Sequence, residues 1–312
     1  MDEFQIIKWI KNFFNSKFIG DDCFNFNNFL ISKDLLIENV HFILKDNLYE
    51  IGAKSIISNV SDILSSGGKP LYFLLALGIP ENFNFQKLKN FFKGLKHYSE
   101  KYNVQLAGGD ISKSKKDFFI SITIIGKVLK KTILRSNAKN NDNIYVIGEL
   151  GDSEIGLKIL KDKINFPEKE YFLKKHFIKE LYPEVIFELV EKNIVNSMID
   201  VSDGFLLDLE HILDESNKSA FIYVKNLPVS ENFKKLANFL SKEEFYTIPL
   251  TSGEEYSIIF TSDKKYDKEI KKISEKHKVK ITFVGEITDR KEKKFYFNDI
   301  DLNIAIKGYK HF

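Results

Sequence analysis

The chain has 312 residues, of which 43% are hydrophobic and 29% are charged, and its formal net charge is +3. This length and composition are typical of a globular protein with two domains, and the near-neutral charge argues against a nucleic-acid partner. The chain has no run of eighteen apolar residues, no signal-peptide pattern and only one cysteine, Cys23, so we expect no membrane partner, no internal disulfide, no cysteine metal site and a cytoplasmic location.

Residues 1–135 are predicted to form a strand-rich domain with crossing helices. Apolar periodicity and turn residues delimit its elements. The expected helices cover residues 3–15, 48–66 and 84–102. The expected strands cover residues 29–32, a run ending at 41–42, and residues 70–80, 104–108 and 118–128. In this reading Asp34 lies between two strands, and Asp110 follows the end of one.

Residues 136–312 are predicted to form a second domain, with the boundary near 135–143. Its expected strands cover 144–148, 220–224, 255–261, 280–286 and 294–298, and its expected helices cover 154–162, 168–178, 183–193, 230–240 and 265–277. Together the two patterns predict an α+β protein. It would combine an N-terminal mixed β-sheet carrying crossing helices with a C-terminal α/β sandwich domain.

The predicted helix 48–66 has an unusual polar face. On a helical wheel its apolar residues share one side, and the opposite side carries Ser55, Ser58, Asn59, Asp62, Ser65 and Ser66. Long charged side chains cover the other predicted helices of this chain. We therefore expect this face to meet a polar group closely rather than solvent.

The stretch 196–211, NSMIDVSDGFLLDLEH, combines acids with a turn. An apolar run carries Asp200, then Ser202-Asp203-Gly204 interrupts it, and a helical pattern follows. This predicts a strand that ends in a tight turn and leads into a helix, whose free N–H groups could bind a phosphate beside the two carboxylates. Ordinary turn and N-cap chemistry is the alternative. An EF-hand is excluded because Phe205 and His211 stand where Gly and Glu are required.

The other candidate acids follow a glycine, lie between two predicted strands or lie on the small-polar helix face, and they are Asp21, Asp22, Asp34, Asp62 and Asp110. Singly, each is more typical of a turn or cap than of a ligand. Together, oxygen ligands without a cysteine or histidine cluster indicate Mg²⁺ rather than Zn²⁺. P-loop, protein-kinase and serine-hydrolase motifs are absent, and Gly148–Gly151 is too weak for a dinucleotide fingerprint.

Several short blocks in order carry a resemblance to a known family. They are IGDDC, ISKDLLIENVHF, NVSDILSSGGKP, LAGGDIS, LRSNAKNNDNIYVIGELGDS, IDVSDG, SGEEYSIIF and KGYKHF. The chain resembles the thiamine-monophosphate kinases, members of an ATP-binding superfamily that includes aminoimidazole ribonucleotide synthetase and selenophosphate synthetase. The resemblance implies ATP-dependent phosphorylation of thiamine monophosphate with several Mg²⁺ ions, and a homodimer formed by the N-terminal domain.

The resemblance also implies site residues. The metal ligands would be Asp22, Asp34, Asp62, Asp110 and Asp200, with Asp203 holding a further ion and Ser32 and Lys33 adding metal or phosphate contacts. ATP would contact Gly109, Asp110, Arg135 and Ser202. Thiamine monophosphate would contact His41, Glu254 and Tyr309. No residue would act as a general base, because the acceptor phosphate is already ionised.

Three departures from the family pattern stand out. Lys33 replaces a more usual Thr, Ser252-Gly253-Glu254-Glu255 replaces Gly-Gly-Glu-Asp, and Asn141-Asp142 replaces Gly-Asp. None of them removes a carboxylate of the expected site, so we expect an active enzyme. The alternatives are a superfamily synthetase, which the single cysteine disfavours for selenide, a Mg²⁺-dependent phosphatase and a non-catalytic nucleotide-binding protein.

Overall fold

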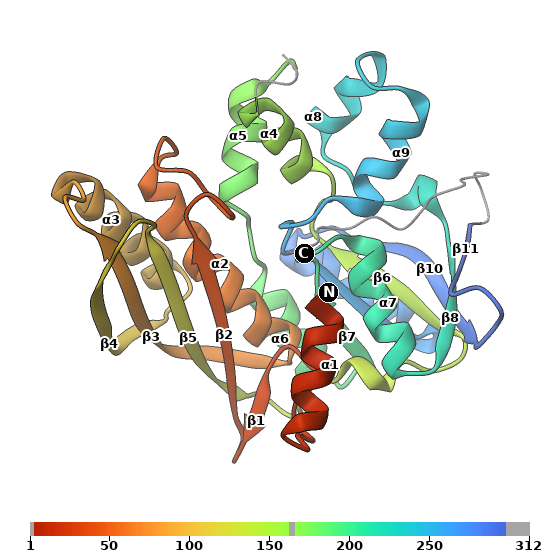
Figure 1. Ribbon diagram of the computed structural model, residues 1–312. Coiled ribbons are helices and arrows are strands. Elements are labelled where there is room, and N and C mark those ends of the chain that lie inside the picture. The colour runs from red at the N-terminus through yellow and green to blue at the C-terminus, as the bar shows by residue number, and fades with distance from the viewer. Residues whose placement is uncertain (1–2, 162–165, 298–312) are drawn as a thin grey trace.

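The computed structural model describes residues 3–161 and 166–297 (Figure 1). The chain folds into two halves, each built on its own sheet. The elements of the first half are α1 (Glu3–Phe13), β1 (Phe24–Phe26), β2 (Phe29–Ile37), α2 (Leu48–Ser65), β3 (Gly68–Pro80), α3 (Phe85–Lys101), β4 (Gln105–Ser114) and β5 (Phe119–Val128).

The first sheet has the strand order β1-β2-β5-β3-β4. Neighbouring strands are antiparallel except for β3 and β4, which are parallel because α3 carries the chain back across the sheet. Helices α2 and α3 cover one face (Figure 1). The opposite face exposes large apolar side chains of β2 and β3, among them Leu35, Tyr72 and Leu74. The edge strand β4 exposes Leu106 and Ile111, which pair with Phe73 and Leu77 and so lie on the helix side of the sheet.

The second half begins with the short 3₁₀ turn η1 (Arg135–Asn137). It continues through β6 (Asp142–Ile147), α4 (Asp152–Leu160), α5 (Lys169–Phe177), α6 (Pro183–Glu191), β7 (Ser197–Asp200), α7 (Phe205–Glu215), β8 (Lys218–Ile222), η2 (Val224–Asn226), α8 (Glu231–Lys234), η3 (Lys235–Asn238), α9 (Lys242–Thr251), β9 (Ile258–Asp263), η4 (Lys264–Tyr266), α10 (Asp267–His277), β10 (Ile281–Asp289) and β11 (Phe295–Phe297). The sheet order is β11-β8-β10-β6-β9-β7, and only the β8–β11 pair is parallel.

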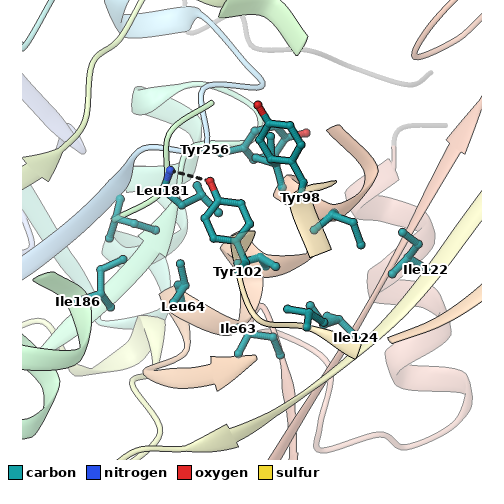
Figure 2. Close-up of a cluster of buried hydrophobic side chains, with 14 of the residues drawn as sticks. Ile63, Leu64, Tyr98, Tyr102, Ile122, Ile124, Leu181, Ile186 and Tyr256 are labelled. Atoms are coloured by element: carbon teal, nitrogen blue, oxygen red, sulfur yellow. Dashed lines mark hydrogen bonds between the residues drawn. The ribbon is translucent and has the colours of Figure 1, made fainter. Parts of the chain in front are cut away.

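A shared apolar core joins the halves (Figure 2). Tyr98 and Tyr102, at the end of α3, pack near Leu181 and Tyr256 of the second half. The backbone N–H of Leu181 donates to the Tyr102 hydroxyl at 3.2 Å. Residues from both sheets belong to this one cluster, so the two halves bury apolar surface against each other. Within the described residues, no helix is both long and apolar enough to cross a membrane.

The α+β class and the two mixed sheets confirm the fold expectation, but several element boundaries were wrong. β2 runs without a break through Lys33 and Asp34, because β5 pairs with it along its whole length. β4 likewise continues through Gly108-Gly109 to Ser114, so Asp110 lies inside a strand. The expected helix 230–240 is split into α8 and a 3₁₀ turn, and α9, which contains Pro249, was not expected.

Candidate active site

The polar face of α2 meets the polar groups that its sequence predicts. The helix begins at Asn47, whose side chain accepts a hydrogen bond from the Tyr49 N–H, and Ser55, Ser58, Asn59, Ser61 and Ser65 are all buried. A buried hydroxyl needs a hydrogen-bond partner. The partners of several of these serines are carboxylates, so the expectation of a close polar contact is confirmed.

Each acid that gathers beside α2 accepts a hydrogen bond from a serine hydroxyl. The pairs are Ser32 with Asp62, Ser61 with Asp200, Ser65 with Asp22 and Ser58 with Asp34. The oxygen–oxygen distance is 2.6 Å in both the Ser32–Asp62 and the Ser61–Asp200 pair. The carboxylates come from the loop before β1, from β2, from α2 and from the end of β7. The structure therefore brings together acids that are far apart in the sequence.

These neighbouring carboxyl groups resist ionisation. Burial, followed by the charge of Asp22, raises the pKa of Asp200 to about 8. Burial and the charges of Asp34, Asp200 and Asp22 raise the pKa of Asp62 well above its usual value. The pKa of Asp34 is raised by burial and by Asp22. Such mutual destabilisation identifies a place where added positive charge would be bound favourably.

Arg135 is a cation within this cluster. Its guanidinium contacts the Asp22 carboxylate through both Nε and Nη2 and donates from Nη1 to the carbonyl of Gly20 at 3.2 Å. Its backbone N–H donates to the exposed Asp21. Cys23 donates its thiol hydrogen to the Asp62 carbonyl oxygen, and burial with the nearby acids raises the pKa of that thiol. Arg135 thus adjoins the acids, where the sequence predicted a contact with ATP.

The turn between β7 and α7 has the form that the sequence predicted. Asp200 ends β7, and α7 begins at Phe205 after Gly204, whose φ is +127°. The Asp208 carboxylate accepts hydrogen bonds from the N–H groups of Asp203 and Gly204, both at 3.0 Å. The expectation of free N–H groups is therefore wrong for these two residues. Ser202 is half-buried, and its carbonyl accepts from the Glu254 N–H at 2.6 Å.

Glu254 lies on a loop that is bound tightly to this turn. Its φ is +55°, and the N–H groups of Glu255 and Tyr256 both donate to the Val201 carbonyl. The Glu254 carboxylate lies 2.5 Å from Lys54 Nζ. Burial alone would raise its pKa, but Lys54 and the nearby histidines, His41 among them, outweigh burial and lower it. His41, whose Nδ1 accepts from the Ile37 N–H, is therefore near Glu254, and the contact of these two residues with thiamine monophosphate stays a prediction.

The neighbouring Glu255 is held from several sides. Its carboxylate accepts hydrogen bonds from the N–H groups of Gly151 and Ser153, at 2.8 and 3.0 Å, and from Ser252 Oγ at 2.6 Å. Lys179 forms a buried ion pair with its other oxygen. Glu255 thus joins the loop to the start of α4. Although Glu255 replaces the more usual Asp at this position, its carboxylate is fully hydrogen-bonded.

Three expected site residues lie apart from the cluster. Lys33 points to the opposite face of β2 from Ser32 and Asp34, and its Nζ donates to Ser121 Oγ at 2.6 Å. Gly109 and Asp110 lie on β4, separated from Asp34 by β5 and β3. Three strand spacings of about 4.8 Å put them roughly 14 Å away. Tyr309 lies outside the described residues.

The carboxylates of the cluster suit a Mg²⁺ ion whose coordination is shared with substrate phosphates. Within residues 3–161 and 166–297, no group of three or more His, Cys, Asp or Glu side chains converges to hold an ion by itself. Mg²⁺ in proteins is usually bound by one or two carboxylates, with water and substrate phosphates completing the octahedron. The carboxyl groups of Asp34, Asp62 and Asp200, whose pKa values are raised by burial and by neighbouring carboxylates, suit that shared mode.

Sequence reasoning missed the site roles of four buried titratable side chains, namely Lys54, Lys179, His176 and Glu255. A signal for Lys54 was present, because it precedes Ser58 by four residues and Asp62 by eight on the same helix. Helical spacing therefore puts a single long cation on the small-polar face. No comparable pattern singles out Lys179 or His176, which reach the site through the path of the chain around α5.

Comparisons with known proteins define the class first. Residues 20–128 match the model described as AIR synthase related protein, N-terminal domain, and residues 139–298 match the model for the C-terminal domain. The chain is 35% identical over 307 residues to a thiamine-monophosphate kinase of Buchnera aphidicola (subspecies Acyrthosiphon pisum), covering 95% of this chain and 92% of the relative. It is 32% identical to the Aquifex aeolicus thiamine-monophosphate kinase, covering 85% and 87%.

A solved structure described as AaThiL complexed with AMPPCP and TMP superposes with a TM-score of 0.87 at 28% identity, covering 100% of this chain and 97% of that one. The thiamine-monophosphate kinase from Aquifex aeolicus superposes with a TM-score of 0.83 at 26% identity, covering 96% and 97%. The chain belongs to the thiamine-monophosphate kinase family.

Proposed function

We propose that this chain transfers the γ-phosphate of ATP to thiamine monophosphate, giving thiamine diphosphate and ADP. The observation that carries the proposal is the cluster of Asp22, Asp34, Asp62 and Asp200, each bonded to a serine hydroxyl. The family relationship supports the choice of substrates. A cytoplasmic location is proposed from the single reduced thiol, Cys23.

The reaction explains why acids gather here without a general base. The acceptor is a phosphate monoester with a second pKa near 6, so it is largely ionised at neutral pH. The barrier lies in bringing two anions together, since unit charges about 4 Å apart repel by roughly 4 kcal/mol at an effective dielectric near 20. When bound, Mg²⁺ would neutralise and align the phosphates. Asp34, Asp62 and Asp200 would hold it.

The remaining groups have assignable tasks. Arg135, which contacts Asp22, is close enough to the acids to give its planar guanidinium to an ATP phosphate. Ser202 and Asp203 border the same point from the β7–α7 turn and would line the nucleotide side. His41 and Glu254 would contact thiamine monophosphate, and we propose the same for Tyr309. Lys33 could contribute only through its backbone.

A homodimer would account for Gly109 and Asp110. These residues lie on the exposed edge strand β4, and the adjoining open sheet face carries exposed Tyr72 and Leu74. An unpaired edge beside an apolar face is a typical association surface. We propose that a second copy packs on this face and supplies Gly109 and Asp110 to the site of its neighbour.

The test is to incubate the purified chain with ATP, Mg²⁺ and thiamine monophosphate and to quantify ADP and thiamine diphosphate. Equal amounts of both products support the kinase. We expect Asp62→Asn to lower kcat by about 10³-fold, because several kcal/mol of charge stabilisation depend on the metal. ADP without thiamine diphosphate would indicate a phosphatase or another acceptor, and no ADP formation would indicate a non-catalytic nucleotide-binding protein.

A further inference from the structure

Lys54 is a buried cation that the proposed reaction leaves without a role. Its side chain is 1% exposed, and it projects from α2 toward the second half of the chain. A lysine that is buried to this degree needs a compensating anion. That anion is Glu254, whose Oε1 lies 2.5 Å from Lys54 Nζ.

The carboxylate of Glu254 depends on Lys54 for its direction. Backbone hydrogen bonds to Val201 and Ser202 fix the loop. They do not fix the side chain. The second basic group near it is His176, whose Nε2 lies 3.8 Å from Oε2. Burial and the charge of Lys54 lower the pKa of His176 to about 3, so this imidazole is neutral at physiological pH. Lys54 is therefore the cation in direct contact.

The relative exposure of Glu254 and Lys54 determines which of them a substrate would contact. The Glu254 side chain is 29% exposed, whereas that of Lys54 is 1% exposed. The ring of Phe177 lies 5.9 Å from the Lys54 ammonium. The carboxylate thus lies between the ammonium and solvent. A ligand entering from solvent would contact Glu254, and Lys54 would act on it only through Glu254.

We propose that Lys54 is a positioning residue that keeps Glu254 ionised and directed at the ring end of thiamine monophosphate. This inference rests on the proposed function. An ionised carboxylate repels the phosphate end of that substrate and attracts the opposite end, which bears the thiazolium charge and the aminopyrimidine N–H donors. The pair also links α2 of the first half to the loop of the second, so the substrate pocket is fixed across the two halves.

The experiment compares wild type with Lys54→Met, Lys54→Arg, Glu254→Gln and the double variant Lys54→Met/Glu254→Gln. Steady-state KM is measured for each substrate, and calorimetry measures binding of thiamine, which lacks the phosphate. We expect Lys54→Met to raise KM for thiamine monophosphate about tenfold. Without Lys54, Glu254 would lose a contact with the substrate that is equivalent to one charge-assisted hydrogen bond. KM for ATP and kcat should stay within about twofold. Thiamine binding should weaken by the same factor, and Lys54→Arg should restore most of it.

Two results would overturn the proposal. If Lys54→Met weakens thiamine monophosphate binding but leaves thiamine binding intact, the ammonium contacts the phosphate itself. If the double variant is much worse than Glu254→Gln alone, Lys54 does not act through Glu254. The double variant also replaces the ion pair by a neutral pair, so it tests the proposal even where Lys54→Met alone does not fold. Failure of the wild type to form thiamine diphosphate would instead refute the proposed function, and thiamine binding would still decide the role of Lys54.

Discussion

Two groups of carboxylates in this molecule are bonded in different ways. Beside α2, Asp34, Asp62 and Asp200 bond to neutral serine hydroxyls, and burial and neighbouring carboxylates raise their pKa values. In the second group, Glu254 and Glu255 each contact a buried lysine. Arg135 contacts Asp22 beside α2, but the three acids of the first group are bonded to neutral groups and therefore favour cations from outside the chain. The second carries its own.

This difference predicts that the first group binds cations and that the lysine pairs of the second group stabilise the fold. A hydroxyl orients a carboxylate without neutralising it, so its negative charge remains available to an incoming cation. An ammonium at contact distance balances that charge, keeps the carboxyl group ionised and fixes the loop. Substitutions in the first group should thus lower activity while relieving repulsion, and substitutions in the second should lower stability.

The largest effect is expected from Asp200→Asn. Removing one anion from the cluster should lower kcat by about 10³- to 10⁴-fold, since it takes away several kcal/mol of metal-dependent stabilisation. The same change relieves charge repulsion, so the thermal midpoint measured without metal should rise. Product assays and melting curves in EDTA measure the two effects. If kcat and the thermal midpoint both fell, Asp200 would stabilise the fold, which would contradict the assignment of the first group to cation binding.

The second group is tested by Lys179→Met, which leaves Glu255 buried without its cation. Breaking a buried pair from one side typically costs roughly 3–5 kcal/mol of unfolding free energy. Urea unfolding measures that loss. Lys175→Met is the matched control, because Lys175 is on the same segment but 28% exposed, with its Nζ 3.7 Å from Glu149, and should change stability by less than about 0.5 kcal/mol. Equal effects of the two substitutions would show that burial of Lys179 is unimportant.

The charge of Glu255 still acts on a neighbouring carboxyl group, that of Asp152. Burial and the charge of Glu255 raise its pKa to about 6, although Ser230 and Tyr171 donate to it. Because the folded state keeps the proton to a higher pH than the unfolded chain, stability should fall as pH rises from about 4 to about 6, by at most about 3 kcal/mol.

The measurement for Asp152 is the unfolding free energy of wild type minus that of Asp152→Asn across this pH range. The subtraction removes the contributions of the other titrating groups. We expect the difference to decline from pH 4 to pH 6 and to be constant above about pH 7. A difference that is flat throughout would mean that Asp152 ionises normally in the folded chain.

The surroundings of the first group of carboxylates could be predicted from the sequence, whereas the lysine partners of the second group could not. The polar face of α2 and the strand–turn–helix at Asp200 could be predicted, because helical periodicity and turn chemistry are local. The lysine partners of Glu254 and Glu255 could not, since a pairing between distant segments depends on how the halves pack. The strand boundaries at Asp34 and Asp110 failed for a related reason.

Both boundaries are decided by neighbouring strands. β5 extends β2 past the polar Lys33-Asp34 pair, which alone looks like a turn. Gly108-Gly109 also looks like a strand end, yet the sheet requires glycine there. A Cβ at Gly109 would lie 1.8 Å from the Leu75 carbonyl oxygen, so the glycine permits close approach of β4 to β3.

The smallest expected effect isolates the serine hydroxyls themselves. Ser61→Ala removes the donor to Asp200 and should weaken Mn²⁺ binding, measured by calorimetry with a non-hydrolysable ATP analogue, by about 10- to 100-fold. Ser55→Ala is the matched control, because Ser55 is equally buried on α2 but donates only to the Ile51 carbonyl of its own helix. It should leave Mn²⁺ affinity unchanged. If both variants bind Mn²⁺ as wild type does, the hydroxyls merely fill space, and the first group of carboxylates is oriented by the backbone alone.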